Sequence, residues 1–312
     1  MSGTVLVLGP QRPNPNLAGV LDARSVQGSI AVVSAGWRHD EGELGALRAD
    51  VGRPVVHLPL YRWFEETLAE HPELAAAYRA RQDRIRAFKS LVRTRLSSVY
   101  GTIVRLHAQR VEDDALHEAE ILDAVRVLRE LDGRVLEGCD AIRAEAGLAA
   151  APWEHPGVAP VRDRIRAVLA DCGAVAIAGG HVAILLNRLE FFGMRELLWH
   201  HHAQGGTIAA WSAGAMVLTD RVVLFYDDPP EGPSEPEVLD RGFGLLRGRT
   251  LFPHARTRLR LDQSDRLRLL EARFGICTGL ESGAALVVQA GVWTDHGVPG
   301  SAPRLAPSAG AA

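Results

Sequence analysis

Short apolar runs rich in β-branched residues alternate with helical patterns in two parts of the chain, and this alternation limits the fold more than any other feature. Gly, Pro and Asn bound the runs, as is typical of strands buried on both faces. Helices between such strands predict an α/β fold with a mainly parallel, doubly wound (flavodoxin-like) sheet, which binds ligands at the carboxyl ends of its strands. The predicted strands are residues 4–8, 29–34, 55–58, 174–178, 207–211, 221–225, 250–252, 276–280 and 284–289.

Residues 62–150 interrupt the alternation and predict a helical hairpin inserted into one α/β domain of residues 1–299. Residues 79–110 hold nine Lys or Arg and one acid, whereas residues 112–123 hold six acids and no Lys or Arg. We expect the two stretches to face each other in an antiparallel hairpin. A basic surface that recruits a peptide or nucleic acid is the alternative, and a homodimer through the insertion stays open. The apolar positions of the two stripes are Ile85, Phe88, Val92, Leu96, Val99, Ile103 and Leu106, then Leu116, Leu122, Val125, Leu128, Leu131 and Val135.

Composition excludes several classes of protein. The formal net charge of -3 gives no reason to expect a polyanionic partner, so a nucleic-acid role is disfavoured. No apolar run approaches the roughly 20 residues of a membrane-spanning helix, and three distant cysteines predict neither a disulfide framework nor a zinc cluster. We expect a soluble, cytoplasmic protein without metal or cofactor. Residues 182–201 predict one helix, 227–240 an acidic loop, and 300–312 a disordered tail.

The sharpest chemical feature is Ser212, which directly follows the predicted strand 207–211 and precedes Ala-Gly-Ala. Small residues let a helix start close to a sheet, as a nucleophile elbow requires, and the N–H of Ala213 is then free to bind an oxyanion. Ala210 replaces the first glycine of the usual pattern, so a structural Ser at a helix N-cap stays open.

Two further residues complete a candidate triad. His254 follows the strand 250–252, and Glu281 follows the strand 276–280, so all three side chains belong to carboxyl ends of strands. A Ser-His-acid group there predicts acyl transfer, with Ser212 as nucleophile, His254 as general base and Glu281 as orienting acid. The order Ser, His, Glu differs from that of α/β-hydrolases. The Gly179-Gly180 turn lies at the same edge, where its N–H groups could complete an oxyanion hole.

Residues 172–289 resemble the serine peptidases that include cyanophycinase and aspartyl dipeptidase (peptidase E), which have a class I glutamine amidotransferase-like fold. The resemblance implies the same triad, with Gly180 and Ala213 as oxyanion donors and a peptide or small dipeptide-like substrate. It also implies that Arg258 and Arg260 help to hold the substrate, and we expect Gly179 and His181 to bind it as well. The matching segments are Gly179-Gly180, Leu185-Leu186, residues 212–215, residues 242–246, His254 and residues 281–284.

Several positions depart from the cyanophycinase pattern. Phe252-Pro253 replaces Asp-Gln before the histidine, Gln263 replaces a third Arg, and His181 stands where Asn or Asp usually follows the Gly-Gly. A shift of one residue would put Ser282 at the acid position. These departures argue against cyanophycin itself as substrate.

The sequence therefore predicts a serine hydrolase that cleaves a peptide or isopeptide bond of the aspartyl or β-aspartyl type through an acyl-enzyme. The alternative is an inactive or acyl-transferring homologue that binds a peptide or another partner through the helical insertion. Geometry separates the two, because His254 Nε2 of a preassembled site lies within about 3.2 Å of Ser212 Oγ, or slightly farther without substrate.

Overall fold

The core of the computed structural model, which describes residues 3–225 and 235–305, is a seven-stranded sheet in the order β11-β10-β1-β5-β4-β2-β3. The five strands from β1 to β3 in that order run parallel, while β10 and β11 run antiparallel at one edge. This topology confirms the predicted α/β fold with a mainly parallel sheet. The strands are β1 (Thr4–Leu8), β2 (Ile30–Val33), β3 (Val55–Leu58), β4 (Ala174–Ile177), β5 (Thr207–Trp211), β10 (Ala285–Gln289) and β11 (Val292–Asp295).

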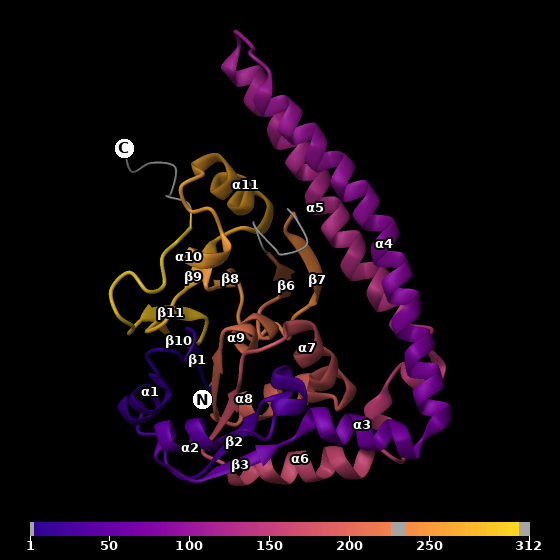
Figure 1. Ribbon diagram of the computed structural model, residues 1–312, viewed down its shortest axis with the longest axis vertical. Helices are drawn as coiled ribbons and strands as arrows, with labels where there is room; N and C mark the ends of the chain where they lie inside the picture. The colour runs from indigo at the N-terminus through magenta and orange to yellow at the C-terminus, as the bar shows by residue number, and fades with distance from the viewer. Residues whose placement is uncertain (1–2, 226–234, 306–312) are drawn as a thin grey trace.

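Helices cover both faces of the sheet (Figure 1). Leu6 and Ile30 face a core closed by α1 (Leu17–Ala23) and α2 (Gly45–Val51). Their neighbours Val5 and Ala31 face the opposite core, because successive side chains of a strand point to opposite faces. The helices of this second face include α6 (Ala159–Asp171), α7 (Val182–Phe191), α8 (Met194–Ala203) and α9 (Ala213–Val217).

Two small sheets flank the main one. β6 (Arg221–Leu224) pairs antiparallel with β7 (Glu237–Arg241), and β8 (Thr250–Pro253) pairs parallel with β9 (Cys277–Leu280). The helices α10 (Ala255–Arg258) and α11 (Ser264–Phe274) connect β8 to β9. The carboxyl end of β8 therefore lies beside that of β9.

The insertion forms α3 (Leu60–Glu70) and then a long antiparallel hairpin of α4 (Pro72–Ala108) and α5 (Asp114–Ala144), here called the arm. Pro72 begins α4, where its missing N–H costs nothing, and Asp113 caps α5 by accepting a hydrogen bond from Leu116 N at 3.0 Å. Figure 1 shows the arm running along the body and projecting past it. The division into one domain with an insertion stays a prediction.

A buried ion pair fastens the arm to the body. Arg273 of α11 donates from Nε and Nη2 to Asp132 of α5 at 2.7 and 2.6 Å, and the two side chains are 0% and 2% exposed. Arg273 also donates to the hydroxyl of Tyr100 on α4, whose pKa burial raises to about 12. Removing one partner of such a pair costs about 3–5 kcal/mol, because the other charge is left buried. The network therefore fixes the arm relative to α11.

The expected pairing of charges within the hairpin is wrong. Within the described residues, no ion pair joins residues 79–110 to residues 112–123. Lys89 and Arg93 instead pair with Asp240 and Glu237 of β7. Most apolar positions of the two stripes are buried, but the predicted positions Leu116 and Leu122 near the tip of the hairpin are 57% and 54% exposed. The side of α4 that carries Lys89 and Arg93 lies against β7.

Three further predictions need correction. The expected helix 182–201 is two helices, because Gly193 adopts a positive φ of 64° between α7 and α8. Residues 237–240 of the expected loop belong to β7, whereas residues 226–234 lie outside the described part. The alternation typical of a strand is interrupted in β7 because its buried residue Asp240 is charged. In the structure this charge is paired with Arg143.

The start of the expected disordered tail is ordered. Ser301 and Leu305 are buried, and Leu305 N donates to Cys277 O at 2.9 Å. Pro303 O accepts a hydrogen bond from Gly279 N at 2.8 Å, so residues 300–305 lie along β9. Residues 306–312 lie outside the described part of the chain.

No helix in the described ranges is both long and apolar enough to span a membrane.

Candidate active site

Ser212 occupies a strained turn at the carboxyl end of β5, the strand between β1 and β4. Its φ of 50° and ψ of -122° are unusual for a non-glycine residue, and its N–H donates to Leu8 O at 3.3 Å. The next residue begins α9. A strand, a strained turn and a helix start in this order form a nucleophile elbow.

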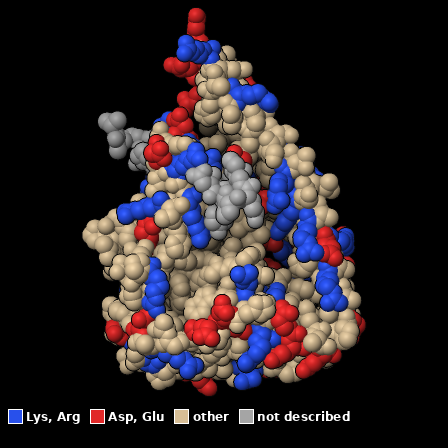
Figure 2. All heavy atoms as spheres, in the orientation of Figure 1, with Lys and Arg blue, Asp and Glu red and all other residues tan. Residues whose placement is uncertain are grey.

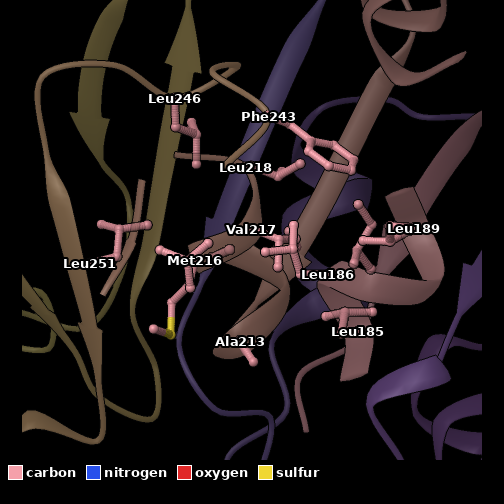
Figure 3. Packing of buried hydrophobic residues seen from close by; sticks show 14 of the residues in the cluster. Leu185, Leu186, Leu189, Ala213, Met216, Val217, Leu218, Phe243, Leu246 and Leu251 are labelled. Carbon is pink, nitrogen blue, oxygen red and sulfur yellow. The ribbon is translucent and has the colours of Figure 1, made fainter. Parts of the chain in front are cut away.

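Packing around α9 explains why the elbow needs small residues. A Cβ on Gly214 would overlap the carbonyl oxygen of Ile177 in β4, so glycine lets α9 start directly against the sheet. Figure 3 shows Val217 of α9 close to Leu186 and Leu189 of α7, with Leu218 and Phe243 beyond them. α9 is therefore held between the sheet and α7.

The Gly179-Gly180 turn lies beside the elbow. A Cβ on Gly179 would stand 2.8 Å from Ser212 Cβ, and Gly180 has a φ of 119° that other residues rarely adopt. Across residues 3–225 and 235–305, neither the N–H of Gly180 nor that of Ala213 donates a hydrogen bond. Two unbonded N–H groups next to a serine are what an oxyanion hole requires.

His254 and Glu281 lie together at the carboxyl ends of β8 and β9. His254 N donates to Leu280 O at 2.9 Å, and Glu281 is the residue that follows Leu280. Glu281 Oε1 accepts a hydrogen bond from Arg256 N at 2.9 Å, at the start of α10. Within the described residues, no hydrogen bond joins His254 to Ser212 Oγ or to Glu281, so the triad contacts are not preassembled.

Burial and nearby charge set the pKa of His254. Burial lowers this pKa below the ordinary value of 6.5, and the positive charge of Arg258 lowers it further. The carboxylate of Glu281 acts in the opposite direction. His254 is therefore neutral at neutral pH, the state in which an imidazole can accept a proton.

Ser212 and His254 line one cavity of about 670 Å³. Glu281 and Arg260 are not among the residues that line it. Much of the wall is apolar, including Trp37, Trp211, Met216, Val223, Leu224 and Phe225. The other predicted site residues in the wall are Gly179, Gly180, His181, Ala213 and Arg258.

The proposed substrate-binding residues differ in their placement. Arg258 is half-buried in the cavity wall, whereas Arg260 is exposed outside it. His181 lies at the rim, where its Nδ1 accepts a hydrogen bond from Ile184 N at 3.3 Å and caps α7. The structure thus brings Arg258 and His181 to the cavity and leaves Arg260 apart.

Sequence reasoning missed the part of the wall that comes from the first fifty residues. Arg12, Trp37 and Asp50 line the cavity, with Arg12 Nη1 donating to Asp50 Oδ2 at 2.6 Å. Gly36 O accepts a hydrogen bond from His181 N at 2.8 Å, which brings the turn after β2 against the Gly-Gly turn. β2 pairs in parallel with β4, so the turns that follow these two strands lie side by side. A prediction of the strand order would have indicated this contact.

One group in the described part of the chain has the composition of a metal site. His71, Glu73 and His155 place one ligand atom each within 4.8 Å of one another, at the junction of α3, α4 and the segment before α6. However, His155 Nδ1 accepts a hydrogen bond from Gly157 N at 3.1 Å, so the proton of neutral His155 lies on Nε2, the atom nearest Glu73. None of the three residues lines the cavity around Ser212.

A comparison with models of known protein families tests the resemblance that the sequence suggested. Residues 156–294 match peptidase family S51. The match confirms the resemblance to peptidase E and cyanophycinase and supports a peptidase of the serine hydrolase class. The S51 segment contains Ser212, His254 and Glu281, and it begins after the arm.

Two solved structures are similar to the chain. One is a peptidase from an acI-B1 actinobacterium, with 15% identity, a TM-score of 0.48, and coverage of 96% of this chain and 88% of the other. Another is a putative peptidase E protein from Listeria monocytogenes EGD-e, with 9% identity, a TM-score of 0.48, and coverage of 96% and 100%. A search of curated proteins found no match.

Proposed function

We propose that the protein hydrolyses a peptide or isopeptide bond of the aspartyl or β-aspartyl type, with Ser212 as nucleophile. The observation that carries the proposal is the strained elbow of Ser212 in the wall of a cavity that also contains His254. The S51 match supports the same class of chemistry.

The mechanism begins when Ser212 Oγ attacks the substrate carbonyl carbon and His254 accepts the hydroxyl proton. The N–H groups of Gly180 and Ala213 donate to the oxygen that becomes negative. Collapse of this intermediate breaks the C–N bond, and His254 returns the proton to the departing amine. Water, activated by His254, then hydrolyses the ester on Ser212.

His254 must rotate toward Ser212 before the first step, because no hydrogen bond joins them within the described residues. Both residues line one cavity, and we propose that rotation about their side-chain bonds brings them into contact. The role of Glu281 is to hold the imidazole tautomer and stabilise the imidazolium. The substrate carboxylate binds Arg258, which lines the cavity near His254, whereas Arg12 of the same wall is paired with Asp50.

A panel of dipeptides tests this function. Wild-type protein is expected to hydrolyse aspartyl or β-aspartyl dipeptides faster than the matched asparaginyl and alanyl dipeptides, and a fluorophosphonate should block the reaction. Release of free amino acids is the measurement. Wild-type protein that cleaves none of the panel and resists the fluorophosphonate would contradict the proposal. An added amine that captures the acyl group would indicate acyl transfer, the alternative use of the same intermediate.

The pH dependence of the reaction tests the role of His254. Because the pKa of His254 is lowered, the midpoint of the fall in kcat/KM at acidic pH should lie below pH 6.5. Arg258→Gln removes a positive charge, so it should raise the pKa of His254 and move this fall to higher pH. Glu281→Gln should move the fall to lower pH. Rate profiles between about pH 5 and pH 8 measure both shifts, and equal profiles in all three proteins would exclude His254 as the base.

A further inference from the structure

A second cavity of about 410 Å³ adjoins the one that contains Ser212. Ala183 of α7 and Leu224 of β6 line both cavities, so the two share a wall. The two cavities are therefore neighbours, and a peptide longer than a dipeptide could extend from the first toward the second.

The outer wall of the second cavity is the arm. Along α4, Gln82, Arg86, Lys89 and Arg93 line it, at spacings of three and four residues that place them on one side of the helix. The S51 match begins only at residue 156, so this wall lies outside the matched segment. The second cavity is therefore lined both by the matched segment and by residues of the arm.

Among the described residues that line the second cavity, the most exposed charges are positive. The side chains of Arg86 and Arg93 are 76% and 61% exposed, whereas those of Glu237 and Asp240 are 27% and 8% exposed. Asp240 is engaged by Arg143 and by Lys89, which also donates to Leu239 O. Figure 2 shows Lys and Arg along the side of the arm that borders the body.

The two exposed arginines already bind carboxylates of the protein itself. A carboxylate of a substrate could bind them in the same geometry. Arg93 donates from Nε and Nη2 to Glu237 at 2.8 Å each, and Arg86 pairs with Asp83 of its own helix. Both pairs contact solvent, so each contributes little free energy and a competing carboxylate can reach the guanidinium groups. A guanidinium forms paired hydrogen bonds with a carboxylate more readily than an ammonium does.

We propose that the second cavity binds the distal part of a peptide substrate and selects an acidic residue there through Arg86 and Arg93. The inference rests on the proposed function, because the scissile bond of this peptide lies at Ser212. The substrate class is then an acidic oligopeptide longer than a dipeptide.

Peptides of increasing length test the inference. The probes are an aspartyl dipeptide that wild type cleaves and hexapeptides that contain the same scissile bond, extended at either end, with distal Glu or Gln. Wild type should cleave the Glu hexapeptide about 3–10-fold faster, in kcat/KM, than the Gln hexapeptide, as an exposed charge pair permits. Arg86→Gln/Arg93→Gln should remove this difference and leave dipeptide cleavage within about twofold of wild type.

Three further variants separate a local effect from a general one. Arg95→Gln removes an exposed arginine of α4 that does not line the cavity, so it should keep the preference for Glu. Ser90→Trp fills the second cavity, and we expect it to slow hexapeptide cleavage about tenfold while the dipeptide is unaffected. Ser97→Trp, also exposed on α4 but outside the cavity, is its control.

The outcomes distinguish the inference from the proposed function. Equal rates for the Glu and Gln hexapeptides in wild type, or unchanged hexapeptide cleavage in Ser90→Trp, would overturn the inference while dipeptide cleavage still supports the function. If wild type cleaves no peptide, the function fails, and fluorescence anisotropy of a labelled Glu hexapeptide then tests the cavity. Binding that Arg86→Gln/Arg93→Gln weakens and Arg95→Gln does not would support it, and equal binding by all three proteins would refute it.

Discussion

Ser212→Ala is expected to reduce peptide hydrolysis by about 10⁴-fold or more, and to abolish covalent labelling by a fluorophosphonate. The reason is that the methyl side chain of the variant has no oxygen to attack the carbonyl, while the cavity and both N–H donors remain. Substrate binding should therefore survive the change. Hydrolysis under saturating substrate, together with mass spectrometry of the labelled protein, measures both effects.

The matched control for this result is Ser282→Ala. Ser282 is half-buried at the same edge of the fold, and its Oγ accepts a hydrogen bond from Asn14 N at 3.2 Å. We expect this variant to retain labelling at Ser212. Full labelling of the Ser212→Ala protein would show that another residue is the nucleophile.

Glu281→Gln should give the second largest effect, a loss of about 10³–10⁴-fold in kcat. An amide cannot stabilise the imidazolium that forms on His254, and its NH₂ group favours the wrong imidazole tautomer. The carbonyl oxygen of the introduced amide can still accept from Arg256 N, so the start of α10 should be preserved. An unchanged unfolding temperature with a lost kcat is therefore the expected combination.

Comparison of Glu281→Gln with Ser282→Ala decides which residue occupies the acid position. In the structure Ser282 Oγ is bound to the Asn14 backbone, while the charge of Glu281 acts on the pKa of His254. We therefore expect Ser282→Ala to change kcat by less than about threefold. A larger loss in Ser282→Ala than in Glu281→Gln would reverse the assignment.

Local patterns predicted the strands and the turn at Ser212 well. β1, β3 and β5 have the predicted bounds, because each is a mainly apolar run that stops at a turn residue: Gly9 follows β1, Pro59 follows β3 and Ser212 follows β5. A turn at Ser212 was expected from a buried strand followed by Ser-Ala-Gly-Ala, whereas the sequence left open an elbow or a helix N-cap. In the structure Ser212 stands at the N-cap position of α9, and its side chain makes no capping hydrogen bond. β7 and β11 were missed because Asp240 interrupts the apolar pattern of β7 and most of β11 is exposed.

The distribution of charge was the part that sequence could not place. The basic stretch of α4 suggested pairing with the acidic start of α5, but Lys89 and Arg93 pair with β7, which lies about 150 positions farther along the chain. Such partners depend on the angle at which the arm crosses the body. Arg273 and Asp132, separated by 141 positions, help to fix that angle.

The sequence by itself determined the α/β class, the turn at Ser212 and the order of the candidate triad, because each depends on a few neighbouring residues and their backbone preferences. Tertiary structure decided which residues surround Ser212: it added Arg12 and Trp37, left Arg260 outside, and placed the arm beside Ala183. The physical reason is that strand order and helix packing bring together segments that lie far apart in the sequence. Local sequence patterns do not specify which of these segments pack together.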